Sequence, residues 1–343
     1  MKSRSCDVRC GAGSRESKAG GAVIIGYGIG EHGLERQRFQ ADHPPEPLPL
    51  WLDVQAPDET EREALRRLLG VRMPSPEEMR EIEPTSRLYQ DGDAIVMTAL
   101  VPESVELEHA ATVEVAFIHV HGRLITLRYA DAAPIDLFVE RLEQDATDCR
   151  DHDAVFLGLL DAVVDRVADG LEFVAAHIDE LSADIFGNGR MRVRRDYRKV
   201  LKGIGEVADA ISRARESLFT LDRLVSFFNI VASTHSGERR GRTRPLSRDI
   251  KSLADHADFL ADKAGFLLDA TLGMVGLEQN AIIKIFSVMA VVFLPPTLIA
   301  SIYGMNFDFM PELDWPLGYP LAILLMIISA ILPYRFFKFR GWL

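Results

Sequence analysis

Two apolar stretches near the carboxyl end dominate the hydrophobic pattern of this chain. Residues 285 to 302 carry no charged side chain, and residues 317 to 334 are uncharged and about as long. An α-helix needs about 20 mostly apolar residues to cross the ~30 Å hydrocarbon core of a bilayer. The pattern therefore predicts two transmembrane helices, at residues 281–302 and 317–336. A loop at 303–316 joins them, and a basic tail at 337–343 follows the second.

The first predicted span carries small polar side chains along one side. Placed 100° apart around a helix, four of them fall within a sector of about 100°: Asn280, Ser287, Thr297 and Ser301. Such groups commonly bond to backbone or join helices inside a membrane. A polar stripe that ends in an asparagine, with Asn306 just beyond the other end, is also typical of a water-filled pathway. Two spans cannot enclose a pathway, so several copies of the chain would have to meet around an axis.

The residues at the end of this span resemble those of a known family. Tyr303-Gly304-Met305-Asn306, with Met310-Pro311-Glu312-Leu313 after it, resembles the region of the Gly-Met-Asn signature of the CorA magnesium transporters. Further similarity runs through Glu278-Gln279-Asn280, Pro295-Pro296-Thr297 and the closing Gly341-Trp342-Leu343. It looks like the enterobacterial-type branch and covers nearly the whole chain after the amino-terminal tail.

The resemblance implies a passive channel through which the membrane potential drives Mg²⁺ uptake, with Co²⁺ and Ni²⁺ as further ions and intracellular Mg²⁺ as regulator. It implies a funnel-shaped homo-oligomer of five subunits and no organic cofactor. The implied selectivity filter consists of Tyr303, Gly304, Met305 and Asn306. The resemblance also implies six pore-lining residues. Asn280 would form an inner polar ring, Ile283 and Leu294 would form apolar constrictions, and Ser287, Thr297 and Ser301 would line the rest of the pore.

The chemistry of Mg²⁺ agrees with neutral oxygen ligands at the outer mouth. Mg²⁺ sheds water reluctantly and requires near-ideal octahedral geometry, so a pore does best to handle the hydrated ion. Side-chain carbonyls of Asn306 and the backbone of Gly304 would supply acceptors there. Glu312 and Asp314 in the outer loop would raise the local cation concentration, although salt weakens exposed carboxylates.

The charges beside the spans predict the topology. The loop at 303–316 contains acidic residues but no lysine or arginine, whereas Lys284 precedes the first span and Arg335, Lys338 and Arg340 follow the second. The positive-inside rule places both termini in the cytoplasm and the loop outside. We expect a multi-pass protein of the bacterial inner membrane.

The rest of the chain reads as a cytoplasmic part of the α+β class. Residues 1–20 are polar and lack the apolar stretch of a secretion signal, so they read as a disordered tail. Alternating patterns predict an α/β domain at 21–145 with a mostly antiparallel sheet. Helical periodicity predicts a stalk region at 146–280. The predicted strands are 50–54, 94–100, 113–120 and 124–128, and the predicted helices are 61–69, 135–147, 151–186, 191–231 and 247–302.

Two patterns imitate other functions. Gly28, Gly30 and Gly33, with Asp53 further on, imitate a dinucleotide-binding fingerprint, but too few residues follow for the helix that this fingerprint requires. We expect a strand and a glycine-rich turn instead. His109, His119 and His121 suggest a metal site, but no further ligand completes the set. We interpret these histidines as surface or turn residues.

Composition narrows the choice of partners. The formal net charge of −12 argues against binding to nucleic acid, which selects basic surfaces. The three cysteines, Cys6, Cys10 and Cys149, form no paired framework, which favours a reducing compartment for the soluble part. Residues 151–186 are acidic and residues 190–199 are basic, so solvated faces and salt bridges between neighbouring helices are expected.

The last long helix is predicted to follow a basic loop at 237–245 and to run unbroken into the first span, with a bend at Pro295-Pro296. Its cytoplasmic part has an apolar stripe that ends at Leu268 and an acidic stripe on the other side. The acidic stripe consists of Asp255, Asp258, Asp262 and Asp269. We interpret the stripe as a solvated face; the alternative is a regulatory Mg²⁺ site between subunits, since oxygen ligands suit this ion.

Two alternative functions stay open. One is a zinc transporter of the same superfamily, which the intact Tyr-Gly-Met-Asn sequence opposes. The other is a membrane-anchored sensor or enzyme. Against it, the sequence offers no nucleophile with a base and no metal-ligand grouping, and an anchor needs no polar stripe.

Overall fold

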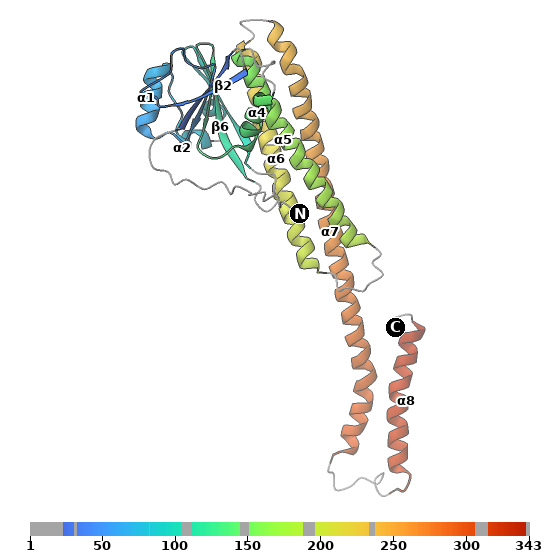
Figure 1. Cartoon of the computed structure of the whole chain (residues 1–343). Helices are drawn as coiled ribbons and strands as arrows, with labels where there is room; N and C mark the ends of the chain where they lie inside the picture. Colours follow the sequence, from blue (N-terminus) through green and yellow to red (C-terminus); the bar gives the residue numbers. More distant parts are fainter. Residues whose placement is uncertain are drawn as a thin grey trace, which may run out of the picture. The chain divides into compact units, whose positions relative to one another are not determined.

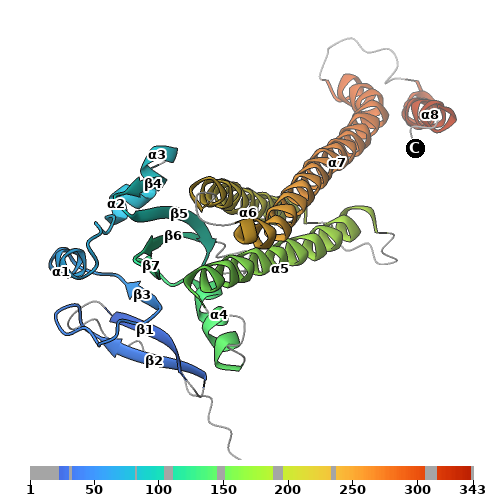
Figure 2. The ribbon, with the colours of Figure 1, turned by 90° about the horizontal axis from the view of Figure 1, so that it is seen from above.

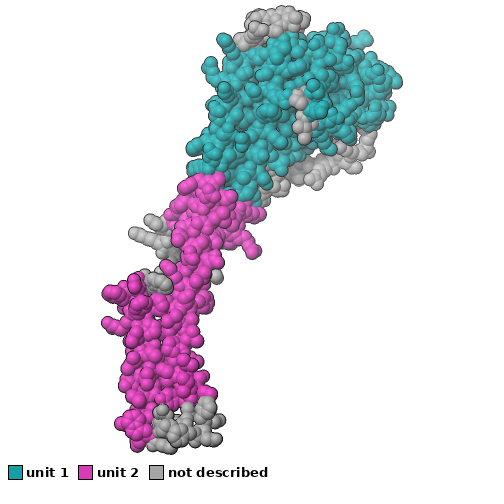
Figure 3. All heavy atoms as spheres, turned by 180° about the vertical axis from the view of Figure 1, so that it is seen from behind, with its two compact units in different colours: residues 1–180, 203–264 teal, residues 181–202, 265–343 magenta. Residues whose placement is uncertain are grey.

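The chain forms two compact units (Figure 3). The computed structural model describes residues 23–30, 33–81, 83–103, 111–144, 151–187, 196–232, 237–305 and 315–340. The first unit comprises Met1–Glu180 and Gly203–Ala264, and the second comprises Leu181–Lys202 and Gly265–Leu343. The long helices therefore contribute residues to both units.

A seven-stranded sheet lies at the centre of the described part of the first unit (Figures 1 and 2). The strand order is β2-β1-β3-β7-β6-β5-β4, and every neighbouring pair is antiparallel except β3 with β7. The expected α/β domain with a mostly antiparallel sheet is confirmed. The strands are β1 (Val23–Gly30), β2 (Gly33–Phe39), β3 (Trp51–Gln55), β4 (Leu88–Asp91), β5 (Ala94–Pro102), β6 (Thr112–Val120) and β7 (Arg123–Arg128).

The glycine-rich segment near the amino end is a β-hairpin. β1 pairs with β2 from Ile24 opposite Phe39 to Gly30 opposite Gly33, so no helix follows the glycines. The predicted strand is confirmed, and the dinucleotide fingerprint has none of the βαβ geometry that it requires. Gly26 has a packing role, because a Cβ there would come within 2.5 Å of the Pro49 side chain.

Two short helices cover one face of the sheet, α1 (Glu59–Leu69) and α2 (Pro76–Arg80), and the one-turn helix α3 (Pro84–Arg87) leads into the edge strand β4. The Asp58 side chain caps α1 by accepting from the Glu61 backbone, and Glu61 accepts in return from the Asp58 N–H. Leu65 and Leu69 of α1 pack into one buried cluster with strand residues such as Ile118. The predicted helix at 61–69 is confirmed and begins two residues earlier, where the cap lies.

Longer helices cover the other face: α4 (Ala133–Gln144), α5 (His152–Phe186) and α6 (Tyr197–Ala232). The Phe117 ring of β6 lies 5.6 Å from the Phe156 ring of α5, measured between centroids. Strand β5 is bonded to α6, since the Ser217 hydroxyl donates to the Leu100 carbonyl over 2.6 Å in a buried contact. Alternate residues of β6 thus face opposite helical layers, as the period of a strand requires.

One histidine prediction is wrong. His119 is only 6% exposed and lies on the α5 side of β6, where its ring contacts Phe156. His121 is an exposed turn residue with φ of 48°, followed by Gly122 with φ of 71°. These positive φ values fit the predicted hairpin turn between β6 and β7. His109 lies outside the described residues.

Helix α7 (Gly237–Tyr303) contains 67 residues, about 100 Å at 1.5 Å per residue. The prediction of a basic loop at 237–245 is wrong, because these residues are helical. Pro245 removes one backbone donor near the start of the helix, and the next turns bury Leu246 and Ile250. The apolar stripe also differs at its end, since Leu267 is 1% exposed whereas Leu268 is 39% exposed.

A buried ion pair fixes the parallel strands β3 and β7. Arg128 Nη2 donates to Asp53 Oδ2 over 2.9 Å and to Asp136 over 3.2 Å. Thr126 donates to the other oxygen of Asp53 over 2.8 Å. Burial alone would lower the pKa of Arg128, but the charge of Asp53, its hydrogen bond and Asp136 together raise it. Nearby, burial raises the pKa of Tyr27 to about 12.

Removing one partner of this pair should destabilise the first unit. Arg128→Ala leaves the carboxylate of Asp53 buried without its cation, which typically costs about 3–5 kcal/mol. We expect the unfolding temperature of the purified protein to fall by roughly 10 °C. The control is Arg141→Ala, which removes a pair with Asp165 whose two side chains are both 57% exposed and should cost under about 1 kcal/mol. Equal effects of the two substitutions would contradict the assignment.

Candidate ion pathway

The second unit contains two helices that are long and apolar enough to cross a membrane, the last part of α7 and α8 (Gly318–Phe339). Only 6% of the most apolar stretch of each helix is buried within the chain. Side chains such as Phe293 and Leu332 are 65% and 66% exposed. Because exposed apolar surface of this extent is unfavourable in water, other copies of the chain or lipid must cover it.

The six predicted pore-lining residues lie on the open surface of α7. Asn280, Ser287, Thr297 and Ser301 are exposed, and Ile283 and Leu294 are 52% and 66% exposed. Their positions follow a seven-residue repeat. One set is Asn280, Ser287, Leu294 and Ser301; the other is Ile283 and Thr297, which Ala290 and Gly304 continue. A seven-residue repeat keeps one seam of a helix facing its partners in a bundle.

The seam lies away from the covered side of α7. Val288 is 6% exposed, the most buried position of the apolar span. At 100° per residue it lies about 130° from the middle of the seam. In α8, Gly318 and Ala322 are buried, and Figures 1 and 2 show α8 beside the last part of α7. The side of α7 that its own chain covers is therefore different from the polar side.

Thr297 is oriented by its own helix. Its hydroxyl donates to the Phe293 carbonyl over 2.7 Å. A hydroxyl that has used its proton in this way presents its oxygen as an acceptor, which suits the protons of a hydrated cation. Helix α7 continues through Pro295-Pro296, and the predicted bend there stays a prediction.

The predicted filter begins where α7 ends. The Gly304 N–H donates to the Ala300 carbonyl over 3.0 Å, and a Cβ at Gly304 would come 3.1 Å from the same oxygen. A side chain at this position would therefore be in tight contact with the last turn of α7. The carboxyl end of a helix carries partial negative charge, which favours a cation beside Tyr303 and Met305. Asn306, Glu312 and Asp314 lie outside the described residues.

The acidic stripe of α7 is exposed in both units. In the first unit, Asp258 forms an ion pair with Arg215 of α6, with Nε 3.0 Å from Oδ1. Both side chains are more than half exposed, so the pair contributes little stability. Asp255 and Asp262 are exposed in the first unit, as is Asp269 in the second. The contact with Arg215 could not be predicted from the sequence, because Arg215 and Asp258 lie on different helices.

The acidic helix α5 forms salt bridges with two other helices, whereas the predicted salt bridges to the basic segment 190–199 stay a prediction. Arg141 of α4 pairs with Asp165 of α5 over 3.0 Å, and Lys263 of α7 pairs with Asp179 of α5 over 2.6 Å. The basic residues 190–195 lie outside the described residues. The acidic helix α5 thus pairs with α4 and α7 within the described part of the chain.

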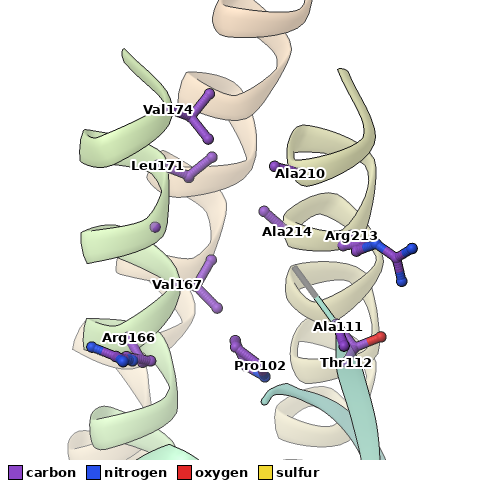
Figure 4. A pocket seen from close by; sticks show the side chains of 11 residues that line it. Pro102, Ala111, Thr112, Arg166, Val167, Leu171, Val174, Ala210, Arg213 and Ala214 are labelled. Carbon is purple, nitrogen blue, oxygen red and sulfur yellow. The ribbon is translucent and has the colours of Figure 1, made fainter. Parts of the chain in front are cut away.

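A pocket between α5 and α6 has no carboxylate among its lining residues (Figure 4). Its walls include Val167, Leu171 and Ala214, and the side chains of Arg166 and Arg213 point away from it in Figure 4. Because Mg²⁺ requires oxygen ligands, this pocket is a poor place for the ion.

The chain combines an α/β unit with two apolar spans, and the first span carries a polar seam. These features are those of a membrane transport protein. Residues 49–338 match the model of a family described as "CorA-like Mg2+ transporter protein", and the chain belongs to this family. The family is one of transporters and not of enzymes.

Similar proteins extend over most of the chain. The magnesium transport protein CorA of Sodalis glossinidius is 35% identical over 294 residues, which are 86% of this chain and 92% of that protein. The magnesium transport protein CorA of Escherichia coli K12 is 34% identical over 314 residues, 90% of this chain and 98% of that protein. The resemblance found in the sequence is confirmed.

Solved structures share the fold. The CorA magnesium transporter from Methanocaldococcus jannaschii superposes with a TM-score of 0.72 at 19% identity, covering 95% of this chain and all of that one. The ZntB cytoplasmic domain from Vibrio parahaemolyticus gives a TM-score of 0.56 at 12% identity, covering 75% of this chain and 99% of that one. At these identities the likeness concerns the fold alone, so it does not separate magnesium from zinc transport.

Cysteine labelling tests which side of α7 meets water. With the native cysteines replaced by serine, Thr297→Cys and Ser301→Cys should react with a charged, water-soluble thiol reagent. The control Ile299→Cys lies at the same depth on the opposite side and should react roughly tenfold more slowly or less, because a thiol in apolar surroundings does not ionise. Labelling of Ile299→Cys with protection of the other two would place the seam against lipid and contradict the pathway.

Proposed function

We propose that the protein is a homo-oligomeric channel, with five subunits, for passive Mg²⁺ uptake. Copies of α7 meet along the seven-residue seam and line a water-filled pore. The observation that carries this proposal is the exposed polar seam, which lies away from the covered side of α7. Membership of the CorA-like family and the magnesium transport proteins at 34–35% identity support Mg²⁺ as the ion.

The pore handles Mg²⁺ with its water shell. Asn306 side chains and the Gly304 backbone accept hydrogen bonds from the hydrated ion at the outer mouth, and Tyr303 and Met305 complete the filter. Thr297 and Ser301 continue the row of oxygen acceptors inward. Neutral acceptors suit an ion that dehydrates reluctantly, and they also admit hydrated Co²⁺ and Ni²⁺.

The deeper pore holds the gate. Leu294 and Ile283 form apolar rings that close the pore by expelling water, with Ser287 between them. Asn280 forms a polar ring at the inner end. Glu312 and Asp314 in the outer loop concentrate cations in front of the filter.

The membrane potential alone can drive uptake. A divalent ion that moves down an inside-negative potential gains about 4.6 kcal/mol per 100 mV. A 1000-fold concentration ratio opposes this with about 4.1 kcal/mol. Both termini lie in the cytoplasm in this proposal, and the membrane is the bacterial inner membrane. The positive-inside rule supports this orientation, because Lys284, Arg335, Lys338 and Arg340 flank the spans whereas the loop between them carries no lysine or arginine.

Uptake into liposomes tests the proposal. Purified protein in vesicles should admit Mg²⁺ without ATP, faster as the inside is made more negative. Asn306→Ala should lower the initial rate about tenfold or more, since each hydrogen bond to a charged group contributes about 1.5–3 kcal/mol. The matched control is Ser329→Ala in α8, whose hydroxyl bonds to its own helix at the Met326 carbonyl and which should keep the rate.

The other functions give different results in this assay. Zn²⁺ uptake that exceeds Mg²⁺ uptake at equal concentration would favour the zinc transporter. Assembled protein that admits neither ion would favour the membrane-anchored sensor or enzyme.

Intracellular Mg²⁺ regulates the pore in this proposal, through exposed carboxylates of α7. Asp255, Asp258 and Asp262 lie on one side of the helix in the first unit, and like charges on one stripe repel unless a cation screens them. Bridging by Mg²⁺ between subunits would favour the closed pore. The pair with Arg215 occupies Asp258 in part, so Asp255 and Asp262 contribute more. Asp269 lies further along α7, in the second unit.

Neutralising the stripe should relieve inhibition by internal Mg²⁺. In vesicles loaded with Mg²⁺, the triple variant Asp255→Asn, Asp258→Asn and Asp262→Asn should need a several-fold higher internal concentration for half-inhibition. Asp184→Asn, an exposed acid on α5, serves as control and should behave as the wild type. A triple variant that is inhibited at the wild-type concentration would show that the stripe is only a solvated face.

A further inference from the structure

A cluster of two histidines and an aspartate lies between the sheet and the start of α5. His119 comes from β6, and His152 and Asp153 are the first two residues of α5. One possible ligand atom from each of the three lies within 4.8 Å of the others. All three belong to the first unit, whereas both apolar spans belong to the second.

The start of α5 presents these side chains in a fixed orientation. The Asp151 carboxylate accepts from the Ala154 N–H over 2.7 Å and so caps the helix. Asp153, one residue inside the helix, is left to face the sheet, and it is 6% exposed. The capping role and the role beside His119 therefore fall to different aspartates.

The distances suit ligands of one metal ion better than hydrogen bonds. Asp153 Oδ1 lies 3.7 Å from His119 Nδ1 and 3.5 Å from His152 Nε2. Hydrogen bonds between such atoms are about 2.7–3.2 Å long. Two ligands that each lie 2.0–2.1 Å from a tetrahedral ion are about 3.3 Å apart. Both separations are close to that value, with the oxygen shared between the two imidazoles.

The surroundings also suit a metal site. The His119 ring meets the Phe156 ring nearly edge-on, at 4.7 Å between centroids, and lies 5.4 Å from the Phe228 ring of α6. An apolar shell limits water and strengthens the attraction between an ion and its ligands. The side chain of His152 is 21% exposed, which gives an ion access from solvent.

We propose that His119, His152 and Asp153 bind one transition-metal ion of the Zn²⁺, Co²⁺ and Ni²⁺ group. Imidazole nitrogens with one carboxylate are typical ligands of these ions, whereas Mg²⁺ selects oxygen. Three protein ligands leave one tetrahedral position for water. The bound ion fastens β6 to the first turn of α5. This site is separate from the pore and goes beyond the proposed Mg²⁺ transport.

Zinc binding by the full-length protein tests the proposal. Protein purified without a polyhistidine tag is stripped with a chelator and titrated with Zn²⁺ in a large excess of Mg²⁺, which occupies oxygen sites. We expect one tight Zn²⁺ per chain by calorimetry and a higher unfolding temperature with Zn²⁺. His152→Ala and Asp153→Asn should each weaken this binding about tenfold or more.

The control variant is His177→Ala. His177 also lies on α5 and pairs with Glu180, with Nδ1 3.4 Å from the carboxylate. Within the described residues, this pair belongs to no cluster of three possible metal ligands. It should leave Zn²⁺ binding unchanged. The proposal is overturned if the wild type shows no tight Zn²⁺ and no rise in unfolding temperature. It is equally overturned if His152→Ala binds Zn²⁺ as tightly as the wild type.

Discussion

A helix that exposes apolar side chains on most of its surface cannot remain in water, and a helix with a polar seam is equally unsuited to lipid on every side. The last part of α7 has both properties, because it is almost entirely uncovered within its own chain and carries Asn280, Ser287, Thr297 and Ser301 along one seam. Lipid can cover the apolar sides, and only further copies of the same seam can enclose the polar one. The proposed assembly follows from this pair of requirements.

Helix α7 meets this constraint by using two different faces. Before the apolar span, the buried positions of α7 repeat every seven residues, as Ile250, Ala257, Ala264 and Thr271. The polar seam begins at Asn280, nine residues after Thr271 instead of seven. Each residue advances 100° around the helix, so the two extra residues shift the repeating face by about 200°. The face that α7 buries within its own chain is therefore nearly opposite to the face that it leaves open in the membrane segment.

The sequence predicts the features of this protein that depend on local pattern. The bounds of α5, the strands β5 to β7 and both apolar spans follow from periodicity and length, and the structure agrees. The loop predicted at 237–245 is helical instead, and the turns that follow it bury Leu246 and Ile250. A helix can therefore include glycine and proline near its start when the next turns pack into the interior of the unit.

Contacts between segments far apart in the chain could not be predicted from the pattern of hydrophobic and polar residues. The sequence does not reveal that His119 is buried, because its neighbours His152 and Asp153 come 33 and 34 residues later in the chain. The contact of Arg215 with Asp258 was invisible for the same reason. The seam of α7 could be found from sequence, because its members share one helix. The partners of the seam could not be found from sequence, because in the proposed assembly they belong to other copies of the chain.

The two ion sites that we propose differ in what they can recognise. A pore of neutral oxygen acceptors contacts the water shell, and hydrated divalent ions of similar size present nearly the same shell. Such a pore selects by charge and hydrated size, and it does not distinguish metal ions whose hydration shells are alike. Direct ligands can, since imidazole nitrogen favours Zn²⁺, Co²⁺ and Ni²⁺ over Mg²⁺. A nitrogen-containing site in the first unit therefore distinguishes ions that the pore treats alike, and it does so on the soluble part of the same chain.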